Sequence, residues 1–160
     1  MLKNGKDTIG LVLVDHGSKL QAANDLLLDV AALFKRVSGE AIVEPAHMEI
    51  CSPTIEDAFD ACVAQGATLI LVHPYFLAPG KHSTRDIPRM TAAAAARHPH
   101  VRYHVTQPLG LDEKIAQVTI ERMQHCISAG FECDYCREIG GCSGGSKERE
   151  TAPERELTAV

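Results

Sequence analysis

The chain has 160 residues, of which 45% are hydrophobic and 23% are charged, and its net charge is −5 at pH 7. This length suits one domain, and the composition excludes a disordered, collagen-like or coiled-coil protein. No apolar run approaches the ~20 residues that span a bilayer, and no basic stripe with interleaved aromatic residues favours nucleic-acid binding. The N-terminus lacks the apolar core of a signal peptide, so we expect a cytoplasmic protein without membrane or nucleic-acid partners.

Apolar runs and amphipathic stretches alternate along the chain. Ile9–Val14 is typical of a strand that is buried on both faces. Pro45 interrupts the second predicted strand and suggests an edge position or a later start of that strand. Ser52 and Pro53 suggest the N-cap and first residue of a helix. The strands are predicted at residues 9–14, 41–50, 68–72 and 101–106. The helices are predicted at residues 21–37, 52–65, 85–97 and 112–128.

This alternation predicts an α/β fold with a parallel sheet of about four strands and helices on both faces. Right-handed crossovers favour the flavodoxin-like strand order 2-1-3-4. In that order the first and third strands are neighbours. Their carboxyl ends meet at the switch point where open α/β sheets bind ligands, so we expect the functional site there.

Two histidines and a carboxylate follow strands that end at this edge. His16 comes directly after the first strand, in Asp15-His16-Gly17-Ser18, and His82 lies in the loop after the third. Neutral imidazole is a common metal ligand and a proton acceptor near pH 7. Together His16 and His82 could hold a divalent metal ion with open coordination positions. Glu49, near the end of the second strand, is a further candidate for a general base.

Cationic residues cluster beside the His82 loop. Lys81, Arg85 and Arg89 would favour an anionic ligand, and Ser18 is expected to cap a helix whose N–H groups attract anions. We expect an inward-facing structural role for His73. Surface or structural roles are expected for the remaining histidines, which are His47, His98, His100, His104 and His125.

The C-terminal region is rich in cysteine, with the pattern Cys126-x6-Cys133-x2-Cys136-x5-Cys142. Four thiolates suit an iron–sulfur cluster, [2Fe-2S] or [4Fe-4S], or a tetrahedral zinc ion, and a thioredoxin-like redox pair is a further alternative. Cys51 and Cys62 are interpreted as ordinary buried cysteines. We therefore divide the chain into an α/β domain at 1–128, a cluster-binding tail at 129–142 and a disordered end at 143–160.

Three motifs occur in order over residues 8–127. They are Val12-Leu13-Val14-Asp15-His16-Gly17-Ser18, then Val72-His73-Pro74-Tyr75-Phe76-Leu77-Ala78-Pro79-Gly80-Lys81-His82 with Asp86-Ile87-Pro88, and then Gln107-Pro108-Leu109-Gly110. Together they resemble the CbiX/SirB-type sirohydrochlorin chelatases. The resemblance implies a chelatase-like fold and insertion of Fe²⁺ into sirohydrochlorin to make sirohaem, or of Co²⁺ on the cobalamin route.

The same resemblance implies site residues and partners. In the family, the histidines matching His16 and His82 bind the metal and assist proton removal. The cysteine tail is similar to that of a subgroup, including plant-type enzymes, that carries an iron–sulfur cluster. Longer relatives contain two such domains facing one cleft, so a homodimer of this chain would supply the second half. The sirohydrochlorin carboxylates would meet Ser18, Lys81, Arg85 and Arg89.

Two other functional classes stay open. The protein could carry a metal ion or a tetrapyrrole without catalysis, or it could be an iron–sulfur redox module. The residues do not choose between Fe²⁺, Co²⁺ and Ni²⁺, because imidazole accepts all of them.

Overall fold

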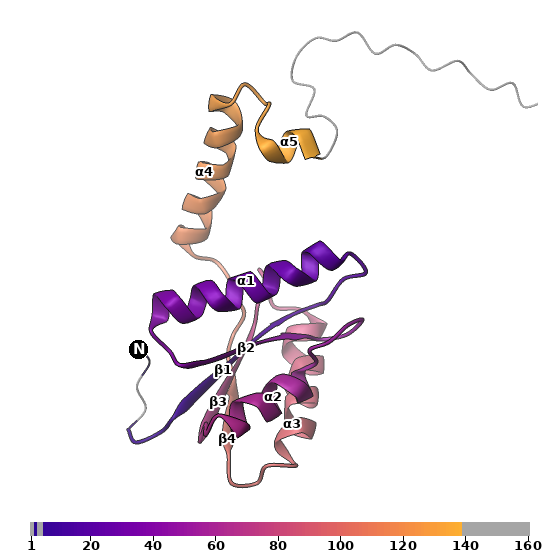
Figure 1. Cartoon of the computed structure of the whole chain (residues 1–160), viewed down its shortest axis with the longest axis vertical. Coiled ribbons are helices and arrows are strands. Elements are labelled where there is room, and N and C mark those ends of the chain that lie inside the picture. The colour runs from indigo at the N-terminus through magenta and orange to yellow at the C-terminus, as the bar shows by residue number, and fades with distance from the viewer. Residues whose placement is uncertain (1, 3–4, 139–160) are drawn as a thin grey trace, which may run out of the picture. The chain divides into compact units, whose positions relative to one another are not determined.

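The computed structural model describes residue 2 and residues 5–138. The chain divides into two compact units, Met1–Leu111 and Asp112–Val160. The first unit contains a parallel sheet in the order β2-β1-β3-β4, which confirms the predicted α/β class and strand order (Figure 1). Among the described residues, no helix is long and apolar enough to cross a membrane.

The strands are β1 (Ile9–Asp15), β2 (Ile42–His47), β3 (Leu69–Pro74) and β4 (Arg102–Val105). β1 lies inside the sheet, and its side chains from Ile9 to Val14 are buried on both faces, as expected for a continuous apolar run. Leu13 pairs with Pro45 on one side and with His73 on the other. Because β2 is an edge strand, the missing N–H of Pro45 can be accommodated there.

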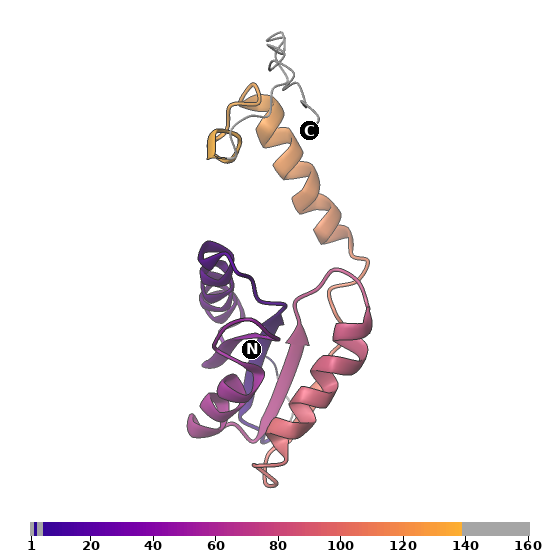
Figure 2. The same ribbon diagram turned by 90° about the vertical axis from the view of Figure 1, so that its right-hand side faces the viewer.

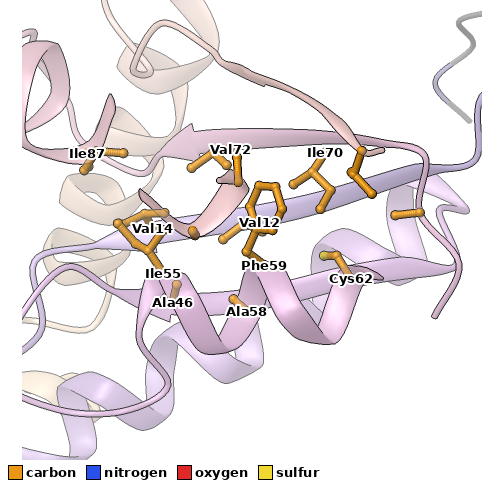
Figure 3. Packing of buried hydrophobic residues seen from close by; sticks show 14 of the residues in the cluster. Val12, Val14, Ala46, Ile55, Ala58, Phe59, Cys62, Ile70, Val72 and Ile87 are labelled. Carbon is orange, nitrogen blue, oxygen red and sulfur yellow. The ribbon is translucent and has the colours of Figure 1, made fainter. Parts of the chain in front are cut away.

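The helices of this unit are α1 (Gln21–Ser38), α2 (Ile55–Ala64), the π-helical turn η1 (His82–Asp86) and α3 (Ile87–Ala95). α1 covers one face of the sheet, while α2 and α3 cover the other (Figure 1). Figure 2 shows η1 running directly into α3. In the larger core, Ile55 and Phe59 of α2 pack against Val12 and Val14 of β1 (Figure 3).

The start of α2 differs from the prediction. Thr54, rather than Ser52, is the N-cap, so Pro53 precedes the helix, and the Ser52–Pro53 peptide bond is cis. The Thr54 side chain accepts a hydrogen bond from the Asp57 N–H at 3.1 Å, and the Asp57 carboxylate accepts one from the Thr54 N–H at 2.8 Å. This reciprocal capping box determines where the helix begins, and its hydrogen bonds lower the pKa of Asp57.

The second unit contains α4 (Glu113–Ser128) and α5 (Asp134–Glu138). Asp112 caps α4 by accepting a hydrogen bond from the Lys114 N–H at 2.8 Å. α5 was not predicted, because a single turn is too short to show a periodic apolar pattern. The predicted disordered end, 143–160, lies outside the described residues, as does Cys142.

Candidate metal centre

The turn after β1 brings the ends of β1 and β2 together. His16 is followed by Gly17, whose φ is +82°. A Cβ at Gly17 would lie 2.1 Å from the carbonyl oxygen of Glu49, so a side chain has no room there. The carbonyl of His16 accepts a hydrogen bond from the Glu49 N–H at 3.2 Å. These contacts hold Glu49 beside His16, as their positions at two strand ends predicted.

The side chains of His16 and Glu49 interact directly. His16 Nε2 lies 2.9 Å from Glu49 Oε1, and Nδ1 lies 3.1 Å from the carbonyl oxygen of Gly17. Because the Gly17 carbonyl and the Glu49 carboxylate both only accept hydrogen bonds, a neutral ring with one N–H can donate to only one of them. With the proton on Nδ1, the lone pair of Nε2 faces the carboxylate. A proton or a metal ion placed between these two acceptors would satisfy both. The pair can therefore bind a cation.

His82 is the second histidine of the site, and it lies on the helical turn η1 rather than in the predicted loop. The Ile87 N–H donates to the His82 carbonyl, five residues back, which is the π-helical pattern. The rings of His16 and His82 have centroids 5.3 Å apart. The structure thus brings together the three residues that were predicted to handle metal and protons.

Asp86 orients His82, although it was not among the predicted site residues. His82 Nδ1 lies 3.0 Å from Asp86 Oδ2, so Nδ1–H donates to the carboxylate and Nε2 is left for a metal ion. Arg85 Nε donates to Asp86 Oδ1 at 3.0 Å. The hydrogen bond from Arg85 lowers the pKa of Asp86 most, and the hydrogen bond from His82 lowers it further. Both keep the carboxylate ionised. The four-residue spacing of His82 and Asp86 is the sequence signal that could have revealed the pair.

A second aspartate, Asp15, stabilises the turn that contains His16. Asp15 Oδ1 accepts a hydrogen bond from the Gly17 N–H at 2.9 Å and lies 2.6 Å from Nδ1 of His47. The His47 side chain is 1% exposed, which confirms a structural rather than a surface position. Asp15 and His47 pair across neighbouring strands in the sheet register. Their contact therefore ties the end of β2 to the peptide that follows His16.

The predicted cationic residues lie along the exposed side of η1 and α3. Lys81, Arg85 and Arg89 follow one another at four-residue intervals, and all three are exposed. The predicted N-cap role of Ser18 is wrong, because the N-cap position is Leu20. Ser18 Oγ instead accepts a hydrogen bond from the Leu20 N–H at 3.0 Å, inside the connecting turn.

His73 has the inward-facing structural role that was expected. Its Nδ1 lies 2.7 Å from Thr106 Oγ1, a contact that joins the ends of β3 and β4. The Thr106 hydroxyl itself donates to the Gln107 carbonyl at 3.1 Å, so His73 is the donor in this pair. Burial lowers the pKa of His73 and favours the neutral imidazole.

Three of the four predicted cluster cysteines converge in the second unit. Sγ of Cys133 lies 3.7 Å from Sγ of Cys126 and 3.2 Å from Sγ of Cys136, and all three sulfur atoms lie within 4.8 Å of one another. Thiolates about 2.3 Å from one tetrahedral metal ion would be about 3.8 Å apart, so this donor set fits a metal or an iron–sulfur cluster. Hydrogen bonding with the backbone and the thiol of Cys136 lowers the pKa of Cys133 and favours its thiolate.

The other two cysteines stand apart from this group. Cys62 is buried as expected, and burial raises the pKa of its thiol to about 12. Cys51 is only partly buried.

Comparison with known proteins places this geometry in a family. The chain is 42% identical over 147 residues to the chloroplastic sirohydrochlorin ferrochelatase of Arabidopsis thaliana, covering 89% of this chain and 65% of that protein. It is 35% identical over 136 residues to the sirohydrochlorin cobaltochelatase of Methanocaldococcus jannaschii, covering 70% of this chain and 95% of that protein.

The fold matches a solved structure of the sirohydrochlorin chelatase SirB from Bacillus subtilis subspecies spizizenii in complex with cobalt. The TM-score is 0.70 at 34% identity, and the match covers 74% of this chain and 50% of that one. The chain thus spans half of that solved protein and less than two thirds of the plant relative. Since residues 10–126 match CbiX and include both histidines of the candidate metal centre, the chain belongs to the CbiX family.

Proposed function

We propose that this protein is a sirohydrochlorin ferrochelatase, which inserts Fe²⁺ into sirohydrochlorin to form sirohaem. The observation that carries the proposal is the pair of imidazoles, with centroids 5.3 Å apart, that meet at the carboxyl edge of the sheet, each beside a carboxylate. The printed names of the plant and Bacillus relatives support the same metal.

The residues of the site match the steps of the reaction. Insertion moves one divalent ion into the ring and releases two pyrrole N–H protons, so the charge balances. Nε2 of His16 and Nε2 of His82 would hold the ion loosely. Glu49 would take up one proton from the ring, and an imidazole freed when the ion leaves would take up the other. Two imidazoles leave positions open for the ring nitrogens, and these open positions let the ion leave the protein.

The carboxylates of the substrate need cationic partners. Lys81 and Arg89 are exposed on the helix that begins at the metal centre. Arg85 uses Nε and one terminal nitrogen on Asp86, so its other terminal nitrogen would bind substrate. Ser18 would contribute its hydroxyl hydrogen, because its oxygen already accepts from the Leu20 N–H.

Cobalt insertion is the second candidate activity. The Methanocaldococcus relative is named a cobaltochelatase, and the solved SirB structure contains cobalt. Imidazole and carboxylate ligands accept both Fe²⁺ and Co²⁺, so metal supply and ring geometry would decide which ion is inserted. Metal or ring binding without turnover would instead favour a carrier.

An anaerobic assay of the full chain with sirohydrochlorin and Fe²⁺, Co²⁺ or Ni²⁺ tests these candidates. We expect turnover with Fe²⁺, and a loss of at least about 100-fold in His16→Ala and His82→Ala without a change in thermal unfolding. His104→Ala, an exposed histidine on β4, is the matched control and should keep full activity. Near-normal turnover by His82→Ala would contradict the proposal.

We infer that Cys126, Cys133, Cys136 and Cys142 hold an iron–sulfur cluster, [2Fe-2S] or [4Fe-4S]. The convergence of the first three sulfur atoms supports this, and the metal centre uses separate residues. Iron and sulfide analysis of anaerobically purified protein should show a cluster that Cys133→Ser removes and Cys51→Ser leaves intact. Stoichiometric zinc in place of iron would contradict it.

We also propose a homodimer as the active assembly. The chain spans half of the matched SirB protein, so a second copy would supply the other half. α1 leaves Leu26, Leu33 and Val37 exposed at positions i, i+7 and i+11, a stripe that suits a protein partner. Light scattering should give twice the mass of the chain, and Leu33→Glu should lower it. The expected cytoplasmic location stays a prediction, since the Arabidopsis relative is named as chloroplastic.

A further inference from the structure

The segment after β2 contains a strained turn beside the metal centre. The Cys51 N–H donates to the Glu49 carbonyl at 3.0 Å, which closes a three-residue γ-turn around Ile50. The φ of Ile50 is +76°, in the left-handed region. β-Branched residues rarely adopt this conformation, and this form of γ-turn is strained. Asn or Gly would adopt it at lower cost.

Contacts on both sides of the turn impose this conformation. The Met48 N–H donates to the Asp15 carbonyl at 2.9 Å, and the Glu49 N–H donates to the His16 carbonyl at 3.2 Å. Gly17 packs against the Glu49 carbonyl oxygen. The backbone is therefore aligned with the His16 turn, but nothing in this arrangement requires an apolar side chain at position 50.

The Ile50 side chain does not offset the strain by packing in the core. It is 55% exposed, although isoleucine is normally among the most buried residue types. Strain that persists without a packing benefit indicates a functional constraint. Glu49, the neighbouring residue, is part of the candidate metal centre, so the strained turn lies directly beside that site.

Other exposed apolar side chains follow the strands that end at the same edge. Leu20 lies after β1, and Tyr75 and Leu77 lie after β3. Together with Ile50 we call these residues the apolar rim. They accompany a polar centre of two histidines with their carboxylates, and cations lie on the adjoining helix. A planar ring with apolar faces, a metal-binding centre and carboxylates at its periphery has the matching chemistry.

We propose that Ile50 contacts the macrocycle of the tetrapyrrole substrate and holds its face against the His16–Glu49 pair. The inference rests on the proposed chelatase function and adds a substrate-contact residue to it. The γ-turn directs the Ile50 side chain away from the core, and binding of the ring removes that side chain from water. The strain then serves substrate binding rather than the stability of the chain.

Steady-state kinetics and ring binding of Ile50→Asn and Ile50→Val test this role in the full-length protein. We expect Ile50→Asn to raise KM for sirohydrochlorin about tenfold, because it removes an apolar contact, and to raise Tm by a few degrees, because Asn tolerates the left-handed conformation. Ile50→Val should keep KM within about twofold. Affinity for Co²⁺ alone should be the same in all three proteins.

Phe131 offers a matched control, since it is the other described non-glycine residue with a positive φ, +62°, and it lies outside the rim. Phe131→Asn should leave KM unchanged. An Ile50→Asn variant with higher Tm and wild-type KM would overturn the inference, as would an equal KM effect in Phe131→Asn. Wild-type protein that binds sirohydrochlorin without turnover would overturn the proposed function alone, and absence of ring binding would overturn both.

Discussion

The buried imidazole of His47 lies 2.6 Å from the carboxylate of Asp15, and the same carboxylate oxygen accepts the N–H of Gly17 at 2.9 Å. One oxygen atom thus joins the end of β2 to the peptide that follows His16. The candidate metal ligand is positioned by a histidine 31 residues further along the chain.

Removing that donor should weaken both the fold and the metal centre. We expect His47→Leu to lower the free energy of unfolding by about 1–3 kcal/mol, because the Asp15 carboxylate loses the hydrogen bond from the imidazole. His47→Asn, with an amide nitrogen near the place of Nδ1, should recover much of the loss. Urea unfolding and Co²⁺ titration measure the two effects. Equal stability of the Leu and Asn variants would show that the hydrogen bond is unimportant.

Asp86→Ala should weaken metal binding while the fold persists. Asp86 accepts the Nδ1–H of His82 and so fixes which ring nitrogen would face a metal ion. We expect the affinity for Co²⁺ to fall about 10–100-fold. Asp29→Ala, which removes an exposed carboxylate of α1, is the control and should bind Co²⁺ normally. Wild-type affinity in Asp86→Ala would refute the orienting role.

Gly17→Ala should disrupt the site through its backbone. A Cβ there would lie 2.1 Å from the Glu49 carbonyl oxygen, in a residue whose φ is +82°. We expect a loss of about 2–5 kcal/mol in unfolding free energy, with loss of turnover. Gly39→Ala has a similar φ of +72° and no atom within 4 Å of the added Cβ, so it separates conformational strain from the clash. It should cost about 1 kcal/mol and keep activity. Comparable behaviour of the two variants would argue against the close approach to Glu49.

His73 should make stability depend on pH below neutrality. Burial lowers the pKa of His73 in the folded state, whereas in the unfolded chain it titrates near ~6.5. The stabilising contribution is therefore present above pH ~6.5 and is lost as the pH falls through the folded-state pKa, because the unfolded chain binds the proton first. His73→Asn, which retains a donor to Thr106, should lose less stability between pH 7 and pH 5. If urea unfolding showed that the wild-type protein and His73→Asn lose the same unfolding free energy between pH 7 and pH 5, this prediction would be contradicted.

Thr91→Val should stabilise the protein. The hydroxyl of Thr91 is buried in the core and has no hydrogen-bond partner within the described part of the chain. Valine has nearly the same shape without the polar atom, so we expect a gain of about 1 kcal/mol in thermal or urea unfolding. Thr119→Val, on the exposed surface of α4, should change stability by less than about 0.5 kcal/mol. A loss of stability in Thr91→Val would show that the hydroxyl is satisfied in solution.

Sequence patterns predicted β1 and β3 well, because these two strands are apolar runs that are mostly buried in the sheet. β1 and the strand order followed from that pattern and from crossover handedness. The helix starts were harder. Ser52 and Thr54 both resemble caps, and the reciprocal bonds with Asp57 decided between them. α5 and η1 are single turns, which carry no periodicity.

The residues of the candidate site that follow strand ends were predicted from the sequence. His16, Glu49 and His82 follow three strands that end at one edge, and topology brought them together. The groups that orient them were missed. The Asp15–His47 pair spans 32 positions, and such a contact depends on strand register that composition does not reveal.

The π-helical turn at His82 has a consequence for how this candidate metal ligand is oriented. This turn holds one residue more than an α-helical turn, while the next residue, Ile87, is fully buried in the core. Deleting a single residue such as Thr84 would let the segment continue as an ordinary helix from the same buried anchor. His82 would then be rotated by about 100° around the axis, since each residue of an α-helix turns by that amount. The direction of the imidazole is thus determined by the length of the backbone between His82 and the core.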